Sequence, residues 1–226
     1  MKTFAIGDIH GCYEEFEKLL GDIGIDFSTD KLIMLGDYID RGDKSYEVIK
    51  KVQSLKEKYG KDKVIVLKGN HEQMAIDYFE SGRTSYLHNG GGVTIESFQR
   101  NGDNLEEYVD CFKELANYYE DENYIYVHGG VKPGVNLNKQ KEEDLLWIRE
   151  EFFLNSHAND KPVIFGHTPT YYINGDYFPV NINRNIAIDT ACYFGGRLSA
   201  LEIEEGKVIE IHQVKNSKKS QNDICA

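Results

Sequence analysis

KLIMLGDYIDRG, residues 31–42, joins a short apolar run to a loop of glycine and charged residues. Such a run is typical of a buried strand whose C-terminal end carries a loop. The same form recurs along the chain, at 3–7, 63–69, 124–128 and 162–167. Because strand ends at one edge of an α/β sheet converge in space, we expect the loops that follow these strands to meet.

Helical patterns separate the first of these strands. Residues 13–20 and 46–59 repeat their apolar side chains at helical spacing, which predicts a βαβ start to an α/β fold. The region 72–120 is mostly helical in pattern, with interruptions at 88–92 and 101–103. After Asn181 the pattern is that of β-strands, at 185–189, 198–203 and 208–214.

The chain has 226 residues, a formal net charge of −12 and no apolar run of the roughly 18–20 residues that a membrane-spanning helix needs. This length fits one domain, which we place at 1–214, followed by a polar tail at 215–226 that we expect to be flexible. The excess of acid argues against sequence-independent binding to nucleic acid or to anionic membranes. No signal peptide is recognisable at the N-terminus, so we expect a cytoplasmic protein.

The four cysteines are scattered and do not predict a disulfide framework. Arg197 follows Cys192, a pairing that phosphatases with a nucleophilic cysteine also contain. Here four residues intervene, a loop too short to wrap a phosphate in successive backbone N–H groups. We therefore expect these thiols to be buried as small apolar side chains.

Metal-binding residue types are concentrated in the loops that follow the predicted strands, and four of the seven histidines fall there. Carboxylate, carboxamide and imidazole groups suit Mn²⁺, Fe or Zn²⁺, and the lack of thiolate disfavours a structural zinc site. The candidate ligands are Asp8, His10, Asp37, Asn70, His128 and His167. These are too many for one tetrahedral site. We therefore expect two divalent ions that share a carboxylate and clamp both oxygens of an in-line phosphoryl displacement.

The motifs GDIHG (7–11), GDYIDRG (36–42), GNHE (69–72), HGG (128–130) and GHT (166–168), in this order, resemble the PPP branch of the calcineurin-like metallophosphoesterases. The resemblance implies an α/β fold with a central two-sheet β-sandwich flanked by helices. It also implies that Asp8 and His10 bind the first metal, that Asp37 bridges, and that Asn70, His128 and His167 complete the second. Mn²⁺ is the ion we expect, with Fe, Zn or Ni as alternatives.

The same resemblance implies roles for the remaining motif residues. His71 would protonate the leaving alkoxide while Asp40 holds its other ring nitrogen. Arg41 would bind the phosphate in bidentate fashion. Arg149, in the segment WIR (147–149), would be the second arginine, an ordinary surface arginine being the alternative. Tyr193 lies in a loop that is near the site in relatives, and we include it among the substrate-binding residues.

Two positions bear on the substrate. Symmetric diadenosine-tetraphosphate hydrolases typically carry a small residue in place of Asp40 and read GNHD at the third motif, and another dinucleotide-hydrolysing group reads GNHC. This chain keeps Asp40 and reads GNHE, as the serine/threonine protein phosphatases do. We therefore expect a hydrolase of phosphoserine and phosphothreonine, similar to the small bacterial members of that group. A metal-bridging hydroxide would attack phosphorus directly, and phosphorylated proteins or peptides would be the partners.

Two other interpretations stay open. The first is a dinucleoside-polyphosphate hydrolase, acting on diadenosine tetraphosphate with the same metal site. The second is a non-catalytic, metal-dependent binding module, against which the intact set of Asp40, Arg41 and His71 argues. The sequence leaves the native metal pair and the oligomeric state open.

Overall fold

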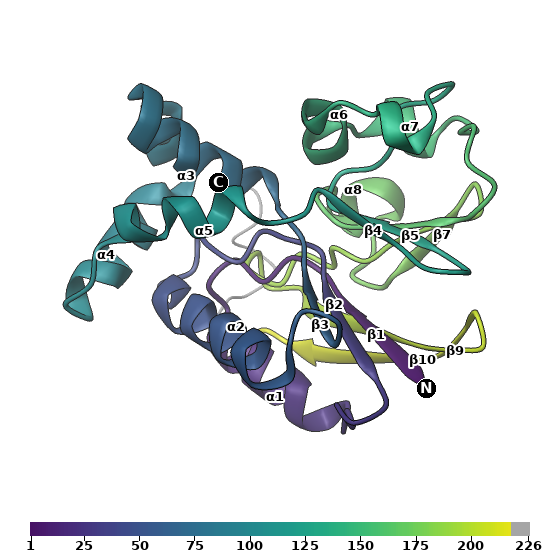
Figure 1. Ribbon diagram of the computed structural model, residues 1–226, viewed down its shortest axis with the longest axis horizontal. Helices are drawn as coiled ribbons and strands as arrows, with labels where there is room; N and C mark the ends of the chain where they lie inside the picture. Colours follow the sequence, from purple (N-terminus) through teal and green to yellow (C-terminus); the bar gives the residue numbers. More distant parts are fainter. Residues whose placement is uncertain (218–226) are drawn as a thin grey trace.

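A sandwich of two five-stranded sheets forms the centre of the computed structural model, which describes residues 1–217 (Figure 1). Helices cover the outer face of each sheet, and a further group of helices lies at one end of the sandwich. The predicted α/β fold with a central two-sheet sandwich is confirmed.

The first sheet has the strand order β10-β9-β1-β2-β3. Its strands are β1 (Lys2–Ile6), β2 (Lys31–Met34), β3 (Val64–Val66), β9 (Arg197–Glu204) and β10 (Lys207–Lys215). β1, β2 and β3 are parallel, with Ala5 opposite Ile33, whereas β9 pairs antiparallel with β1. The crossover helices α1 (Tyr13–Asp22) and α2 (Ser45–Tyr59) lie on one face of this sheet (Figure 1). The predicted βαβ start is therefore present.

The second sheet has the order β4-β5-β6-β8-β7. Its strands are β4 (Tyr118–Glu120), β5 (Ile125–Val127), β6 (Val163–Phe165), β7 (Val180–Ile182) and β8 (Asn185–Ala187). The central strands β5, β6 and β8 are parallel, and each edge strand pairs antiparallel with its neighbour. β4 falls inside the region 72–120 that the sequence pattern marks as mostly helical. This short strand exists because its tyrosines pair across a hairpin with β5, a tertiary contact that local periodicity does not show.

The remaining helices follow the loops that the sequence singles out. They are α3 (Asn70–Ser81), η1 (Leu87–Gly91), α4 (Gly92–Arg100), η2 (Leu105–Tyr108), α5 (Val109–Lys113), η3 (Leu137–Lys139), α6 (Glu142–Trp147), α7 (Glu150–Phe153) and α8 (Thr170–Asn174). The interruption predicted at 88–92 is a π-helical turn that leads straight into α4, with Gly90 at a φ of 98°. Asn89 and Gly90 have non-helical backbone angles, so the predicted interruption is a kink between two helical segments.

Apolar side chains form three layers. In β1, Phe4 and Ile6 pack toward the outer helices, whereas Ala5 faces the other sheet, as the period of two in a strand requires. β6 repeats this arrangement, since Ile164 joins the layer between the sheets and Val163 packs with the residues of α6 and α7. Both faces of the strands are therefore buried, which explains their near-continuous apolar runs.

Two expectations about the ends and the thiols need correction. β10 includes Lys215, and Asn216 is buried, so residues 215 and 216 do not belong to the flexible tail expected at 215–226. Residues 218–226 of that tail lie outside the described residues, as does Cys225. Cys12 and Cys192 are buried, as expected, but Cys111 is exposed on α5. None of the helices in the described part of the chain is long and apolar enough to cross a membrane.

Candidate metal centre

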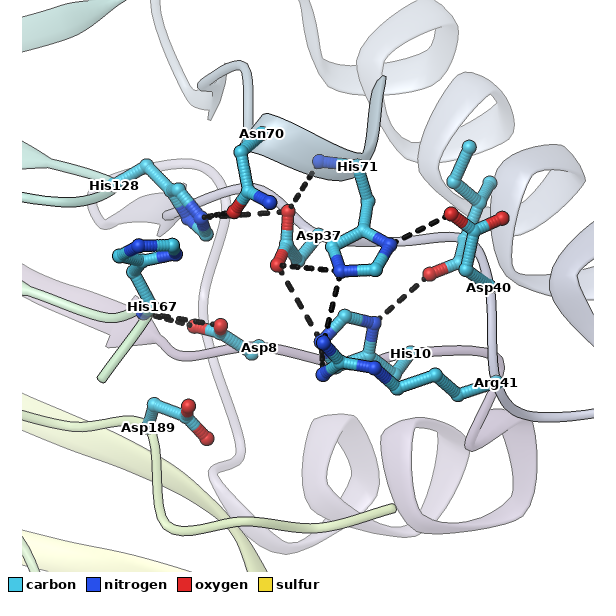
Figure 2. A network of polar contacts seen from close by, with 12 residues as sticks. Asp8, His10, Asp37, Asp40, Arg41, Asn70, His71, His128, His167 and Asp189 are labelled. Atoms are coloured by element: carbon cyan, nitrogen blue, oxygen red, sulfur yellow. Dashed lines mark hydrogen bonds and ion pairs between the residues drawn. The ribbon is translucent and has the colours of Figure 1, made fainter. Parts of the chain in front are cut away.

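The predicted site residues converge at the C-terminal edge of the parallel strands (Figure 2). Asp8 and Asp37 lie in the loops that follow β1 and β2, and Asn70 begins α3 just after β3. His128 and His167 follow β5 and β6, so the second sheet supplies the other side of the site. All six predicted metal ligands are buried.

Asp37 lies at the centre of the site. Its Oδ2 is 3.4 Å from Nε2 of His10, and its Oδ1 is 3.4 Å from Nε2 of His128. Two groups of three potential ligands share this carboxylate, one with His10 and His71 and the other with His128 and His167. Burial disfavours its charge, but His128, His71 and His10 outweigh burial and hold the pKa of Asp37 well below its usual range. A permanently charged carboxylate between two histidine groups suits a bridging ligand.

The histidines are set up as neutral ligands. Nδ1 of His10 donates to the carbonyl of Ile39 at 2.9 Å, and Nδ1 of His128 donates to that of Leu35 at 3.0 Å. These bonds leave each Nε2 unprotonated, which is the tautomer that a metal ligand needs. Burial lowers the pKa of His10, His128 and His167, which keeps the three imidazoles uncharged at neutral pH.

Two contacts test whether divalent cations fit here. Nε2 of His167 is buried and has no hydrogen-bond partner among residues 1–217. Nε2 of His128 faces Oδ1 of Asn70 at 2.8 Å. Because the ring proton is on Nδ1, where it is hydrogen-bonded to the carbonyl of Leu35, both facing atoms are acceptors. A cation shared by the imidazole and the carboxamide satisfies both atoms, so the donor set fits bound divalent ions.

Asp8 reaches the site with a different set of partners. Both of its oxygens accept the backbone N–H of His167, at 3.0 and 3.2 Å, so this carboxylate holds the GHT loop in place. Burial raises the pKa of Asp8, as does the neighbouring Asp189. A Cβ at Gly166 would lie 2.1 Å from Oδ1 of Asp8, so only glycine permits this close approach. Asp8 lies outside the two three-residue groups, and its predicted role as a ligand stays a prediction.

His71 and Asp40 form the predicted pair. Nδ1 of His71 donates to Oδ2 of Asp40 at 2.6 Å, and the other oxygen of Asp40 accepts a hydrogen bond from Oγ1 of Thr94 at 2.7 Å. The backbone N–H of Asp40 also donates to Oγ1 of Thr94. Nε2 of His71 is thereby left facing the centre of the site. This geometry is the one that a proton donor held by a carboxylate requires.

Arg41 lies between two histidines of the site. Its Nη1 is 2.6 Å from Nε2 of His10, and its Nη2 is 2.9 Å from Nε2 of His71 (Figure 2). The guanidinium also stacks over the ring of Phe194 at 5.3 Å. The adjacent Tyr193 is half-buried and lines the same cavity as Arg41. Phe194, which was not predicted, is thus an aromatic neighbour of the arginine.

Arg149 reaches the site from the opposite side. It is half-buried, and its Nη1 donates to the carbonyl of His167 at 2.8 Å and to Oγ1 of Thr168 at 3.1 Å. The ordinary surface-arginine interpretation therefore does not describe its position. Its predicted role in binding phosphate stays a prediction.

Two buried acids at the site, Glu72 and Asp189, have no role that the motifs predict. Glu72 accepts backbone N–H groups of Asp37, Tyr38 and Gly69, each at 2.9 Å, and so fixes the loop that presents Asp37. Burial and the charge of Asp37 raise the pKa of Glu72 to about 7. Asp189 lies beside Asp8, and burial raises its pKa to about 6 (Figure 2). A signal for Asp189 was present, because it too ends an apolar run at the edge of a strand.

Backbone strain is concentrated at the site. Five site residues have φ between 47° and 71°, a region that disfavours side chains with a Cβ: His10, Asp37, Asp40, Arg41 and His167. Each such residue costs roughly 1–2 kcal/mol relative to an ordinary backbone conformation. The surrounding hydrogen bonds over-determine these conformations, which is typical of a functional site.

Comparisons with known proteins agree with this geometry. A profile of the calcineurin-like phosphoesterases matches residues 1–197. The asymmetrical bis(5'-nucleosyl)-tetraphosphatase PrpE of Bacillus cereus (strain Q1) is 26% identical over 240 residues, which cover 93% of this chain and 94% of that relative. Among solved structures, a putative diadenosine tetraphosphatase superposes with a TM-score of 0.68 at 20% identity, covering 96% of this chain and 94% of that one. A serine/threonine phosphatase from Saccharomyces cerevisiae with similarity to human PP5 gives 0.65 at 15% identity, covering 95% and 79%.

Proposed function

We propose that this chain, which belongs to the calcineurin-like phosphoesterase family, hydrolyses bis(5'-nucleosyl) tetraphosphates with two divalent metal ions. The observation that carries the substrate class is the match to the asymmetrical tetraphosphatase, which extends over nearly the whole of both chains. From the motifs alone, this substrate is the alternative to phosphoserine and phosphothreonine. Matching over nearly the full length outweighs the two motif positions on which that preference depended.

The metal ions would be held by residues of both sheets. Asp8 and His10 would bind one ion, as the family resemblance implies, and Asn70, His128 and His167 would bind the other. Asp37 would be shared between them. Two divalent ions, when bound, would supply an activated water and neutralise the charge of the phosphate chain. We propose Mn²⁺ for both positions, with Fe, Zn or Ni as the alternatives.

The protein's own groups then determine where the substrate binds. Arg41 and Arg149 lie on opposite sides of the centre, and each would donate to phosphoryl oxygens in the forked geometry of a guanidinium. Nε2 of His71 lies 2.9 Å from Nη2 of Arg41, so an oxygen bound by that arginine would be within reach of His71, which would donate a proton to it when Nε2 as well as Nδ1 is protonated. Asp40 would keep the ring of His71 in the orientation that makes this transfer possible.

The decisive experiment measures kcat/KM of the Mn²⁺-loaded protein for diadenosine tetraphosphate and for a phosphoserine peptide, and separates the products by chromatography. We expect the dinucleotide to be favoured by more than tenfold and to yield ATP and AMP, the products of asymmetrical cleavage. Asp37→Asn, assayed beside the wild type, shows that the activity belongs to this site. A higher kcat/KM for the peptide would overturn the substrate class, and ADP as the sole nucleotide product would overturn the asymmetry.

A serine/threonine phosphatase is the second candidate, and one observation favours it. The His71–Asp40 pair is fully formed, and a serine or threonine alkoxide is a far poorer leaving group than a nucleotide and depends more on a proton donor. The same pair disfavours a non-catalytic binding module, which has no use for a leaving-group acid. Absence of p-nitrophenyl phosphate hydrolysis with Mn²⁺, Zn²⁺, Fe²⁺ and Ni²⁺ would revive that third interpretation.

A further inference from the structure

Two buried thiols lie together next to the metal centre. Cys12 follows the GDIHG motif and precedes α1, and Cys192 lies in the loop between β8 and β9. Their sulfur atoms and a carboxylate oxygen of Glu15 all lie within 4.8 Å of one another. The two cysteines are 180 positions apart in the sequence. Neither thiol has a part in the proposed reaction.

The two thiols differ in their access to solvent. Cys12 lines a cavity of about 250 Å³, and Arg41 and Gly42 form part of the same wall. Cys192 is 2% exposed and is not among the residues that line this cavity. A small oxidant that enters this cavity therefore meets Cys12 first. Burial, together with the neighbouring Cys12, raises the pKa of Cys192, so this thiol stays protonated until a base removes its proton.

We propose that Cys12 and Cys192 are a redox pair, which a peroxide converts to an intramolecular disulfide. The sulfur of Cys12 attacks one peroxide oxygen, the O–O bond breaks, and a sulfenic acid and a first molecule of water (or alcohol, from an alkyl peroxide) form. The sulfur of Cys192 then attacks the sulfur of Cys12 and displaces the hydroxyl group. Glu15 takes the proton of Cys192 and passes it to that hydroxyl group, which leaves as a second water. The two thiols give up two electrons, and the peroxide accepts them.

Disulfide formation would disturb a metal ligand. The sulfur atoms must approach to about 2.0 Å, so one or both loops have to shift. Cys12 is two residues from His10, and its thiol donates to the carbonyl of His10 at 3.7 Å. A shift of Cys12 therefore moves the imidazole that lies 3.4 Å from Asp37. We expect metal binding to weaken about 10-fold or more, as for the loss of other groups that orient metal ligands.

The test counts thiols rather than activity alone. In a Cys111→Ser/Cys225→Ser background, hydrogen peroxide followed by denaturation and thiol titration should reduce the free thiols from two to none, and dithiothreitol should restore both. Peptide mapping of the untreated and oxidised wild-type chain should identify a Cys12–Cys192 disulfide, which keeps the test valid if the double variant does not fold. With Cys192→Ser in the same background, Cys12 should stop at the sulfenic acid and become labelled by dimedone.

Metal analysis of the oxidised and re-reduced protein completes the experiment. The oxidised form should need about tenfold more free Mn²⁺ for half-saturation. Two free thiols that persist in the double variant, under peroxide that oxidises Cys111 in the wild type, would overturn the proposal. So would a disulfide that links two separate chains, or one that leaves the Mn²⁺ affinity unchanged.

Discussion

Nδ1 of His71 donates to Oδ2 of Asp40 at 2.6 Å, although the two residues come from different loops and are 31 positions apart. Both side chains are almost fully buried, with exposed fractions of 1% and 0%. The bond fixes which nitrogen of His71 carries its proton toward Asp40, and so which nitrogen faces the substrate. Replacing His71 therefore tests whether this side chain acts as a proton donor or as a metal ligand.

His71→Asn should lower kcat by about 100-fold or more for a serine phosphoester, whose alkoxide needs a proton, and much less for p-nitrophenyl phosphate. The bound metal, measured by mass spectrometry, should be unchanged. His71, His10 and Asp37 also form a potential ligand group, whose ligand atoms lie within 4.8 Å of one another. Loss of metal from this variant would therefore show that His71 is a ligand and not an acid.

Asp37→Asn should nearly abolish hydrolysis and reduce the bound metal per chain. The carboxamide is uncharged, and it cannot bring the same negative charge to the two histidine groups that now share the carboxylate. Metal analysis and activity are measured on the same preparation. Asp62→Asn, at an exposed position of the loop before β3, is the matched control and should behave as the wild type.

Thr94→Val tests a positioning residue that no motif contains. Valine keeps the shape of threonine but removes the hydroxyl that bonds both the carboxylate and the backbone N–H of Asp40. We expect kcat to fall about tenfold with little change in KM, and Thr94→Ser to restore it. A purely structural role would instead lower the melting temperature of Thr94→Val without this selective effect on kcat.

Gly166→Ala should weaken metal binding by about 10- to 100-fold. The new methyl group would meet Oδ1 of Asp8 at 2.1 Å and displace either the carboxylate or the GHT loop that it holds. Titration with Mn²⁺ measures the affinity. Gly21→Ala, where an added Cβ has nothing within 4 Å, should leave the affinity as it is. Equal affinities in the two variants would contradict the steric argument.

The acid sensitivity of the fold should depend on Glu202, far from the metal centre. Burial disfavours its charge, but hydrogen bonds from Lys2 and His212 outweigh burial and hold its pKa below the ordinary value of 4.5. A carboxyl with a lowered pKa stabilises the folded state above its unfolded pKa, and this stabilisation is lost as the pH falls through the folded value. Glu202→Gln should therefore flatten the decrease in the free energy of unfolding below pH 4.5, measured by urea titration. The exposed Glu122→Gln should retain the wild-type slope.

Local pattern predicted the elements of the site better than the contacts between them. The loops that carry Asp8, Asp37 and His128 could be found because an apolar strand precedes each one, and strand ends gather at a sheet edge. Thr94 could not be found in this way. It lies in the first turn of α4, and its role exists only because the fold brings it to Asp40, 54 positions away. The contact of Phe194 with Arg41 could not be predicted for the same reason, since Arg41 lies in a loop that is distant in the sequence.

Glu72 shows a different limit of sequence analysis. The sequence shows that Glu72 occupies the fourth position of GNHE. Only the structure shows that its oxygens accept backbone N–H groups of the loop that follows β2. A motif identifies such a residue, whereas its hydrogen-bond partners, and therefore its role, depend on atoms elsewhere in the chain. Substrate choice is a still finer property, and two motif letters were insufficient to decide it.

The shared position of Asp37 has a consequence for how the protein matures. One potential ligand group belongs to loops of the first sheet, whereas the other is complete only when His128 and His167 of the second sheet dock against Asp37. A folding intermediate in which the second sheet has not yet docked would therefore lack the second ligand group. Full metal occupancy would then act as a checkpoint that reports the final docking step of biogenesis.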